Sequence, residues 1–275
     1  MYCTRNVSDS VVWVGASDRR LALFENLFPI PRGVSYNSYL ILDEKTALLD
    51  TTDASVTRQY LENVSHSLNG KPLDYLIINH MEPDHCANIA ELLLRYPHLT
   101  LVGNAKTFAF VSQFYDLDLT GRTLTVKEGD TLCLGSHTLH FFLAPMVHWP
   151  EAMVSYDTVD KILFSADGFG TFGAINGNLF ADEVNFERDW LDDARRYFIN
   201  IVGKYGPSVQ GLLKKASALD ISVIAPLHGP VIDKDFDFYI DKYMRWSSYQ
   251  PEEKGTVIAL SLIHISEPTR RTPIS

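Results

Sequence analysis

The chain has 275 residues, of which 46% are hydrophobic and 12% aromatic, the composition of an ordinary globular protein. Its formal net charge of -10 argues against non-specific binding to nucleic acids and against docking on anionic membranes. No apolar run reaches membrane-spanning length, and the first ten residues lack the apolar centre of an export signal, so we expect a cytoplasmic protein. The three cysteines show no CxxC pairing, which fits reduced thiols.

The first half of the chain alternates segments with strand and helix patterns. Short apolar runs bounded by turns predict strands, and apolar residues at helical spacing predict helices. The predicted order is a strand at 11–14, a hairpin within 38–50, a helix at 55–68, a strand at 75–79, a helix at 85–95, a strand at 100–103 and a helix at 106–114.

The second half begins with short β runs and ends with helices. The pattern predicts a meander at 123–144, strands at 152–156 and 161–164, helices at 189–204 and 207–219, a strand at 222–226 and a helix at 235–249. A β-then-α set in each half indicates a layered α/β architecture. Since no GxGxxG follows a strand and no phosphate loop occurs, we do not expect a nucleotide-binding fold.

Four residues with metal-binding side chains follow the buried strand at 75–79 within six positions: His80, Glu82, Asp84 and His85. Alternation places the first three on one side of the chain, and Pro83 delays the start of the next helix. Asp84 could alternatively serve only as the N-cap of that helix. Cys86 lies beside this cluster, and we interpret it as a small buried residue. Two imidazoles and two carboxylates on one turn form half of a coordination shell.

Three further segments each end an apolar strand in a residue that can bind a metal. FFLAPMVHWP contains His148, KILFSADGFG contains Asp167 and SVIAPLHGP contains His228. Taken alone, each histidine is typical of a packed side chain, and an Asp before Gly is typical of a turn. Together with the dense cluster they complete a set of four imidazoles and three carboxylates. We interpret the remaining histidines as surface or structural residues: His66, His98, His137, His140 and His264.

Seven candidate ligands are too many for one metal ion, but they suit two ions that share a bridging carboxylate. The absence of thiolates from the set argues against a structural zinc site. Imidazole and carboxylate ligands together favour iron or manganese, although zinc also accepts them.

The pattern His80-x-Glu82-x-Asp84-His85, with His148, Asp167 and His228 downstream, resembles the metallo-β-lactamase superfamily. Its general HxHxDH pattern implies zinc hydrolases, but Glu82 replaces the second histidine as in the flavodiiron proteins (A-type flavoproteins). The phrases HWPEAM, LFSADGFGTFG and PLHGP also resemble that family. The resemblance runs from about residue 1 to 250 and implies an α+β fold, a four-layer αβ/βα sandwich of two mixed sheets flanked by helices.

By that resemblance one iron takes His80, Glu82 and His148, the second takes Asp84, His85 and His228, and Asp167 bridges them. In some members the equivalent of His85 does not bind iron. The resemblance implies reduction of dioxygen to water, or of nitric oxide to nitrous oxide, with electrons from a rubredoxin-like donor. The electrons pass through the FMN of a flavodoxin-like domain, which faces the diiron site of the neighbouring subunit in a head-to-tail homodimer.

The resemblance also divides the chain into a metal domain at 1–250, the start of a flavodoxin-like domain at 251–260 and a tail at 261–275. KGTVIAL at 254–260 is typical of the opening strand of a flavin domain, but the tail lacks the glycines of an FMN phosphate loop. The tail resembles adapter-derived sequence, and the alternative is a natural disordered C-terminus. We therefore expect a chain that binds two irons and no FMN.

Two other functions stay open at this point. The chain could be a zinc hydrolase, for instance a thioesterase, that acts through metal-bound hydroxide. It could also be a folded but inactive binding module. Glu82 and the three flavodiiron-like phrases argue against the hydrolase.

Overall fold

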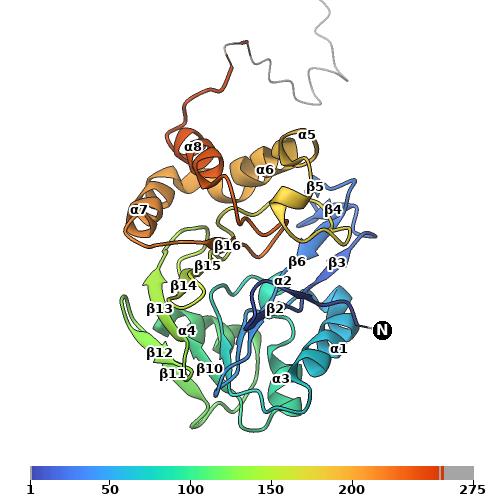
Figure 1. Cartoon of the computed structure of the whole chain (residues 1–275), viewed down its shortest axis with the longest axis vertical. Coiled ribbons are helices and arrows are strands. Elements are labelled where there is room, and N and C mark those ends of the chain that lie inside the picture. The colour runs from blue at the N-terminus through green and yellow to red at the C-terminus, as the bar shows by residue number, and fades with distance from the viewer. Residues whose placement is uncertain (1, 254, 257–275) are drawn as a thin grey trace, which may run out of the picture.

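The computed structural model describes residues 2–253 and 255–256 (Figure 1). Two mixed sheets form the centre of a four-layer sandwich, as the resemblance implied. The larger sheet has the order β1 (Arg5–Asn6), β2 (Val11–Trp13), β7 (Tyr39–Ile41), β8 (Ala47–Leu49), β9 (Tyr75–Ile77), β10 (Thr100–Gly103) and β11 (Thr123–Thr125). The smaller sheet has the order β12 (Thr131–Cys133), β13 (Thr138–Leu143), β14 (Met153–Asp157), β15 (Ile162–Phe164) and β16 (Val223–Ala225).

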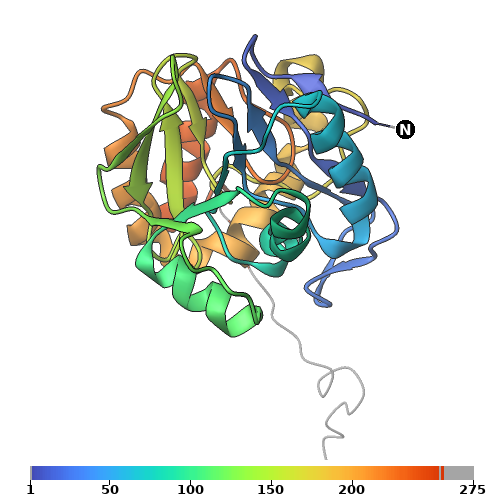
Figure 2. The ribbon, with the colours of Figure 1, turned by 90° about the horizontal axis from the view of Figure 1, so that it is seen from below.

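Helices cover the outer face of each sheet (Figure 2). The larger sheet is covered by α1 (Thr57–Leu68), α3 (Ile89–Arg95) and α4 (Ala105–Phe114). The smaller sheet is covered by α6 (Leu191–Tyr197), α7 (Gly206–Ala216) and α8 (Phe236–Ser247). Two short helices, α2 (Pro83–Cys86) and α5 (Phe186–Asp189), complete the α-helices of the described residues.

Alternate residues of each strand supply two different cores, because successive side chains point to opposite faces of a sheet. Leu40 and Leu76 pack under the helices of the larger sheet, whereas Tyr39 and Ile77 face the smaller sheet. Leu76 is completely buried, which stabilises the fold by about 1.5–3 kcal/mol. The predicted strand is therefore present and contributes to both cores, but it covers Tyr75–Ile77 rather than 75–79.

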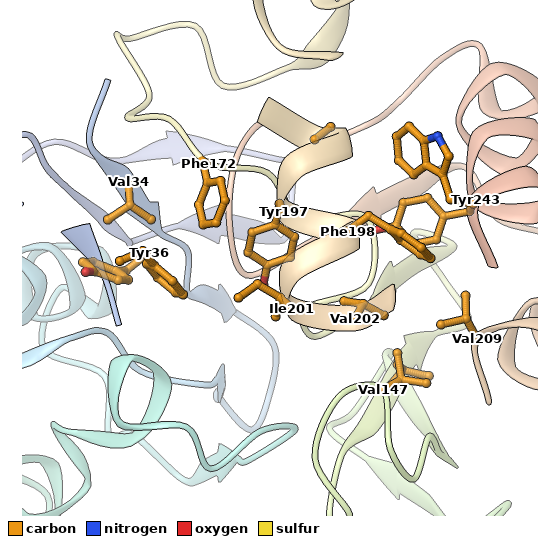
Figure 3. Close-up of a cluster of buried hydrophobic side chains, with 14 of the residues drawn as sticks. Val34, Tyr36, Val147, Phe172, Tyr197, Phe198, Ile201, Val202, Val209 and Tyr243 are labelled. Atoms are coloured by element: carbon orange, nitrogen blue, oxygen red, sulfur yellow. The ribbon is translucent and has the colours of Figure 1, made fainter. Parts of the chain in front are cut away.

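The outer face of the smaller sheet packs against a cluster rich in aromatic residues (Figure 3). Tyr197 and Phe198 come from the end of α6, and Tyr243 comes from α8. Phe172, from the loop after β15, lies between Tyr197 and Val34 in this view. The ring of Phe172 lies 5.2 Å from that of Tyr197 and 5.4 Å from that of Phe24, so the cluster connects the C-terminal helices to the first half of the chain.

The prediction of one helix at 85–95 is wrong, because the structure has two helices there, α2 and α3. The break lies between them, where the amide Nδ2 of Asn88 donates to the carbonyl of Thr52 at 2.6 Å. Asp84 is not the N-cap, since Glu82 occupies that position without a side-chain capping bond.

The helix predicted at 189–204 is also divided. It consists of the end of α5, then α6, a π-helical segment at Phe198–Val202 and a 3-10 turn at Gly203–Tyr205. Gly206-Pro207 opens α7 rather than preceding it, since proline suits the first turn of a helix. The final helix lies within its predicted range.

The sequence patterns missed two small antiparallel pairs. These are β3 (Ala16–Asp18) with β6 (Val34–Tyr36), and β4 (Leu23–Phe24) with β5 (Phe28–Pro29). Strands of two or three residues carry too few positions for a detectable alternation. The predicted flavin-domain strand lies outside the described residues except at 255 and 256, and the tail at 261–275, including His264, lies outside them entirely. Among the described residues, no helix has the length and apolar character to cross a bilayer.

Candidate metal centre

The topology brings the ends of four strands to one edge of the sandwich. Strands β13, β15 and β16 run in the same direction, because β14 is antiparallel to β13 and to β15 while β16 is parallel to β15. His148, Asp167 and His228 follow these three strands and therefore lie at the same edge. The cluster that begins at His80 follows β9 of the larger sheet. All seven candidate ligands of the sequence analysis converge where the two sheets meet.

The first group of side chains consists of His80, Glu82, His148 and Asp167, and all four are buried. The Nε2 atom of His148 lies 3.0 Å from Glu82 Oε2 and 2.9 Å from Asp167 Oδ2. The Nε2 atom of His80 lies 3.1 Å from that of His148 and 3.3 Å from Asp167 Oδ2. Four potential ligand atoms thus face a common point.

The second group consists of Asp84, His85 and His228, which are also buried. The Nε2 atoms of the two histidines lie 3.0 Å apart. Asp84 Oδ1 lies 3.4 Å from His85 and its Oδ2 lies 3.3 Å from His228. This group repeats the chemistry of the first, with two imidazoles and one carboxylate.

Asp167 lies between the two groups and presents one oxygen to each. Its Oδ2 faces His80 and His148, whereas its Oδ1 lies 3.3 Å from His85 Nε2 and 3.7 Å from His228 Nε2. Both oxygens of Asp167 and both oxygens of Asp84 are buried without a hydrogen bond to any of the described residues. Buried carboxylates normally have hydrogen-bond partners, so these free lone pairs fit a pair of cations with Asp167 as the bridge.

The electrostatics of the cluster also favour added positive charge. Burial by itself lowers the pKa of His148, but the adjacent carboxylates of Asp167 and Glu82 outweigh it and raise the pKa to about 9. Burial by itself raises the pKa of Asp167, but His80 and His148 lower it well below its usual value. The carboxylates favour protonated imidazoles because they favour positive charge nearby. Metal cations can supply that positive charge in place of the protons.

Residues that the sequence analysis missed hold the candidate ligands in place. The Nδ1 atom of His80 lies 2.9 Å from Glu151 Oε1, and the Nδ1 atom of His228 lies 2.7 Å from the backbone oxygen of Ser35. Glu151 belongs to the HWPEAM phrase, three residues after His148, and this proximity was the available signal. Ser35 lies in β6, one of the strands without a sequence pattern.

Aromatic rings and one acidic side chain border the cluster. The rings of Phe24, Tyr36 and Tyr197 lie 5.6, 5.8 and 5.4 Å from that of His228. Glu25, in the turn between β4 and β5, lies beside Glu82: burial and the Glu82 carboxylate raise the pKa of Glu25 to about 7. The border therefore combines an apolar wall with a group that titrates near neutrality.

Other polar residues singled out in the sequence belong to neither of these two ligand groups. Cys86 is buried, as predicted, and burial raises the pKa of its thiol to about 12. His137 is buried with its Nδ1 atom 3.0 Å from Asp157 Oδ2, a structural contact beside the β12–β13 turn. His66 stacks on Tyr2 with ring centroids 3.4 Å apart.

Comparison with known proteins places this geometry in a family. The family described as ODP family beta lactamase matches residues 34–229. The anaerobic nitric oxide reductase flavorubredoxin of Aeromonas hydrophila is 32% identical over 256 residues, which is 92% of this chain and 51% of that protein.

Two solved structures share the fold at a TM-score of 0.85 and 29% identity: the flavodiiron protein of Giardia intestinalis and the rubredoxin oxygen:oxidoreductase of Desulfovibrio gigas. Each match covers 90% of this chain, and 60% and 62% of those chains respectively. The chain thus spans between half and two thirds of the length of these relatives. It belongs to the ODP family of beta-lactamase-like domains and matches the metallo-β-lactamase-like part of flavodiiron proteins.

Proposed function

We propose that this chain is the diiron domain of an oxidoreductase that reduces dioxygen to water or nitric oxide to nitrous oxide. The observation that carries the proposal is Asp167, which presents one oxygen to each of two matched sets of imidazole and carboxylate ligands. One iron would be held by His80, Glu82 and His148, and the second by Asp84, His85 and His228. Two adjacent irons would supply electrons to both atoms of a small substrate, which a single zinc ion cannot do.

The residues around the cluster have roles that fit this reaction. The rings of Phe24, Tyr36 and Tyr197 lie against the ring of His228, and we propose that this apolar side of the cluster favours a small apolar gas over a hydrolytic substrate. Glu25 lies beside Glu82, and in the metal-free protein burial and the Glu82 carboxylate raise its pKa to about 7. Both reductions consume protons, and we propose this carboxyl as a source of one.

The electron supply is proposed from the relatives. Their names include flavorubredoxin and rubredoxin oxygen:oxidoreductase. We therefore propose that a full-length protein with this domain takes electrons from a rubredoxin-type donor through the FMN of a flavodoxin-like domain, which faces the irons of the neighbouring subunit in a head-to-tail dimer. The FMN would be held by a flavodoxin-like domain and not by the metal-binding domain.

The test begins with metal content under anaerobic conditions. Iron-loaded protein should contain about two irons per chain, as its two ligand sets require. After chemical reduction and removal of the reductant, exposure to nitric oxide should yield about one nitrous oxide per iron pair, because that reaction needs only two electrons. Gas chromatography measures the product.

The main competing outcome is a zinc hydrolase. Iron-replete preparations that contain a single zinc and hydrolyse thioesters would replace the proposal with that function. Protein that holds two irons but neither oxidises nor forms nitrous oxide would leave only a metal-binding module.

A further inference from the structure

The two proposed metal sites have matched inner ligands. Each has two imidazoles and one carboxylate of its own, and each shares Asp167. The first set is His80, His148 and Glu82, and the second is His85, His228 and Asp84. A difference between the two metals in affinity must therefore come largely from what lies behind these ligands.

The groups behind the imidazoles differ in charge. Behind His80 is the carboxylate of Glu151, 2.9 Å from Nδ1, and both side chains are completely buried. Behind His228 is a neutral backbone oxygen, that of Ser35. The Nδ1 atom of His85 is buried with no hydrogen-bond partner in the described part of the chain. The first site has an anionic partner that the second lacks.

Glu151 is itself held in a fixed orientation. Its Oε1 atom also accepts from the backbone N–H of Met81 at 2.9 Å, and its backbone oxygen accepts from the amide Nδ2 of Asn104 at 2.6 Å. It lies two residues before β14, in the same loop as His148. One carboxylate thus connects the turn that carries His80 and Glu82 to the loop that carries the other histidine of the same site.

A carboxylate behind a metal-binding histidine has two physical effects. It keeps the proton on Nδ1, so that Nε2 is free to bind the metal, and it makes the imidazole a stronger ligand. A charged acceptor does this more strongly than a neutral carbonyl, because charge-assisted hydrogen bonds are about twice as strong.

We propose that Glu151 is a positioning residue that makes the two sites unequal, so that the site of His80 fills first and holds its metal more tightly. The inference rests on the proposed function only in assuming that the cluster binds two metal ions. It concerns the order in which the two sites fill, which their matched ligand sets do not by themselves determine.

The experiment measures cobalt(II) binding to metal-free protein under nitrogen by visible absorption and calorimetry. His228→Ala leaves the first ligand set intact, and His148→Ala leaves the second intact. His228→Ala should bind one cobalt about 10–100-fold more tightly than His148→Ala does. Adding Glu151→Gln to His228→Ala should remove most of that advantage and shift the cobalt absorption bands, whereas adding it to His148→Ala should change neither quantity.

Ser155→Ala provides a matched control for a purely structural effect. The hydroxyl of Ser155 donates to Asn79 Oδ1 at 2.7 Å, so it too connects the two sheets from a buried position, without contacting a candidate ligand. In the His228→Ala background this change should lower the melting temperature and leave cobalt affinity and spectrum unaltered.

Three results would overturn the inference. Equal affinities of His228→Ala and His148→Ala would do so, even if the Glu151 variant failed to fold. An equal effect of Glu151→Gln in both backgrounds, or no effect in either, would show that the residue does not distinguish the sites. If the unaltered chain bound no metal, the proposed function would fail as well, whereas two equal sites would contradict this inference alone.

Discussion

Asn79 binds Asp50 at two points: its backbone N–H donates to Oδ1 at 2.8 Å and its side-chain Nδ2 donates to Oδ2 at 2.9 Å. The backbone N–H of His80 donates to the same Oδ1 at 3.1 Å. The buried carboxylate therefore satisfies the backbone where β9 ends and the candidate ligands begin. Burial raises the pKa of Asp50 to about 6, although the bonds from Asn79 and His80 oppose that rise.

Replacing Asp50 by alanine should destabilise the metal-free protein by about 3 kcal/mol or more, because several buried donors lose their acceptor. Urea unfolding followed by circular dichroism would measure the loss. Asp116→Ala, at an exposed position, is the control and should have almost no effect. A similar unfolding midpoint for both variants would show that this carboxylate does not hold the turn.

Asp167→Ala should remove both metals, because the bridge belongs to both ligand sets. Glu82→Ala should mainly weaken the first site and His228→Ala the second. Elemental analysis of protein loaded and washed under identical conditions gives the number of irons per chain. Full iron retention by the Asp167 variant would exclude Asp167 from the ligand set.

Glu82→His should raise the ratio of zinc to iron in protein grown in the same medium. The change replaces a hard anionic oxygen with a neutral, softer nitrogen and recreates the HxHxDH pattern of zinc enzymes. Glu128→Gln, at an exposed glutamate, controls for the loss of one negative charge. An unchanged ratio would mean that Glu82 does not determine metal choice.

The affinity for metal should rise with pH between about 6.5 and 9. In the folded, metal-free protein the pKa of His148 rises from 6.5 to about 9. The protonated imidazole therefore stabilises the metal-free fold fully below pH 6.5, and this contribution is lost as the pH rises to 9. Metal binding requires the neutral imidazole and so releases that proton. Competition with a chelator should show an increase of about tenfold per pH unit for each proton released. A flat profile would contradict the raised pKa.

The sequence predicted the parts of the site that depend on strand ends. His148, Asp167 and His228 each follow an apolar run, and runs of that kind become central strands whose ends meet at one edge. Residues 76–79 were correctly identified as buried, although Tyr75 is only partly buried and the strand itself ends at Ile77. These features depend on local pattern, which survives in a single sequence.

The remaining features depend on tertiary contacts and had no local pattern. Glu151 and Asp50 resemble ordinary turn carboxylates until the sheets bring them to the turn at His80. The break between α2 and α3 comes from Asn88, whose side chain bonds to a loop that lies 36 residues earlier. Such contacts join segments that are distant in sequence, so the local hydrophobic periodicity does not predict them.

Each proposed metal site takes ligands from both sheets, and this has a consequence for how the chain folds. The imidazole pairs join positions separated by 68 residues in one site and 143 in the other. A bound ion is thus a reversible cross-link that closes a long loop, and it reduces the freedom of the unfolded chain as such links do. Since neither sheet holds a complete set, strong binding can begin only after the sheets have come together. Metal capture should therefore be a late event in folding, and chelation should first loosen the seam between the sheets rather than either sheet alone.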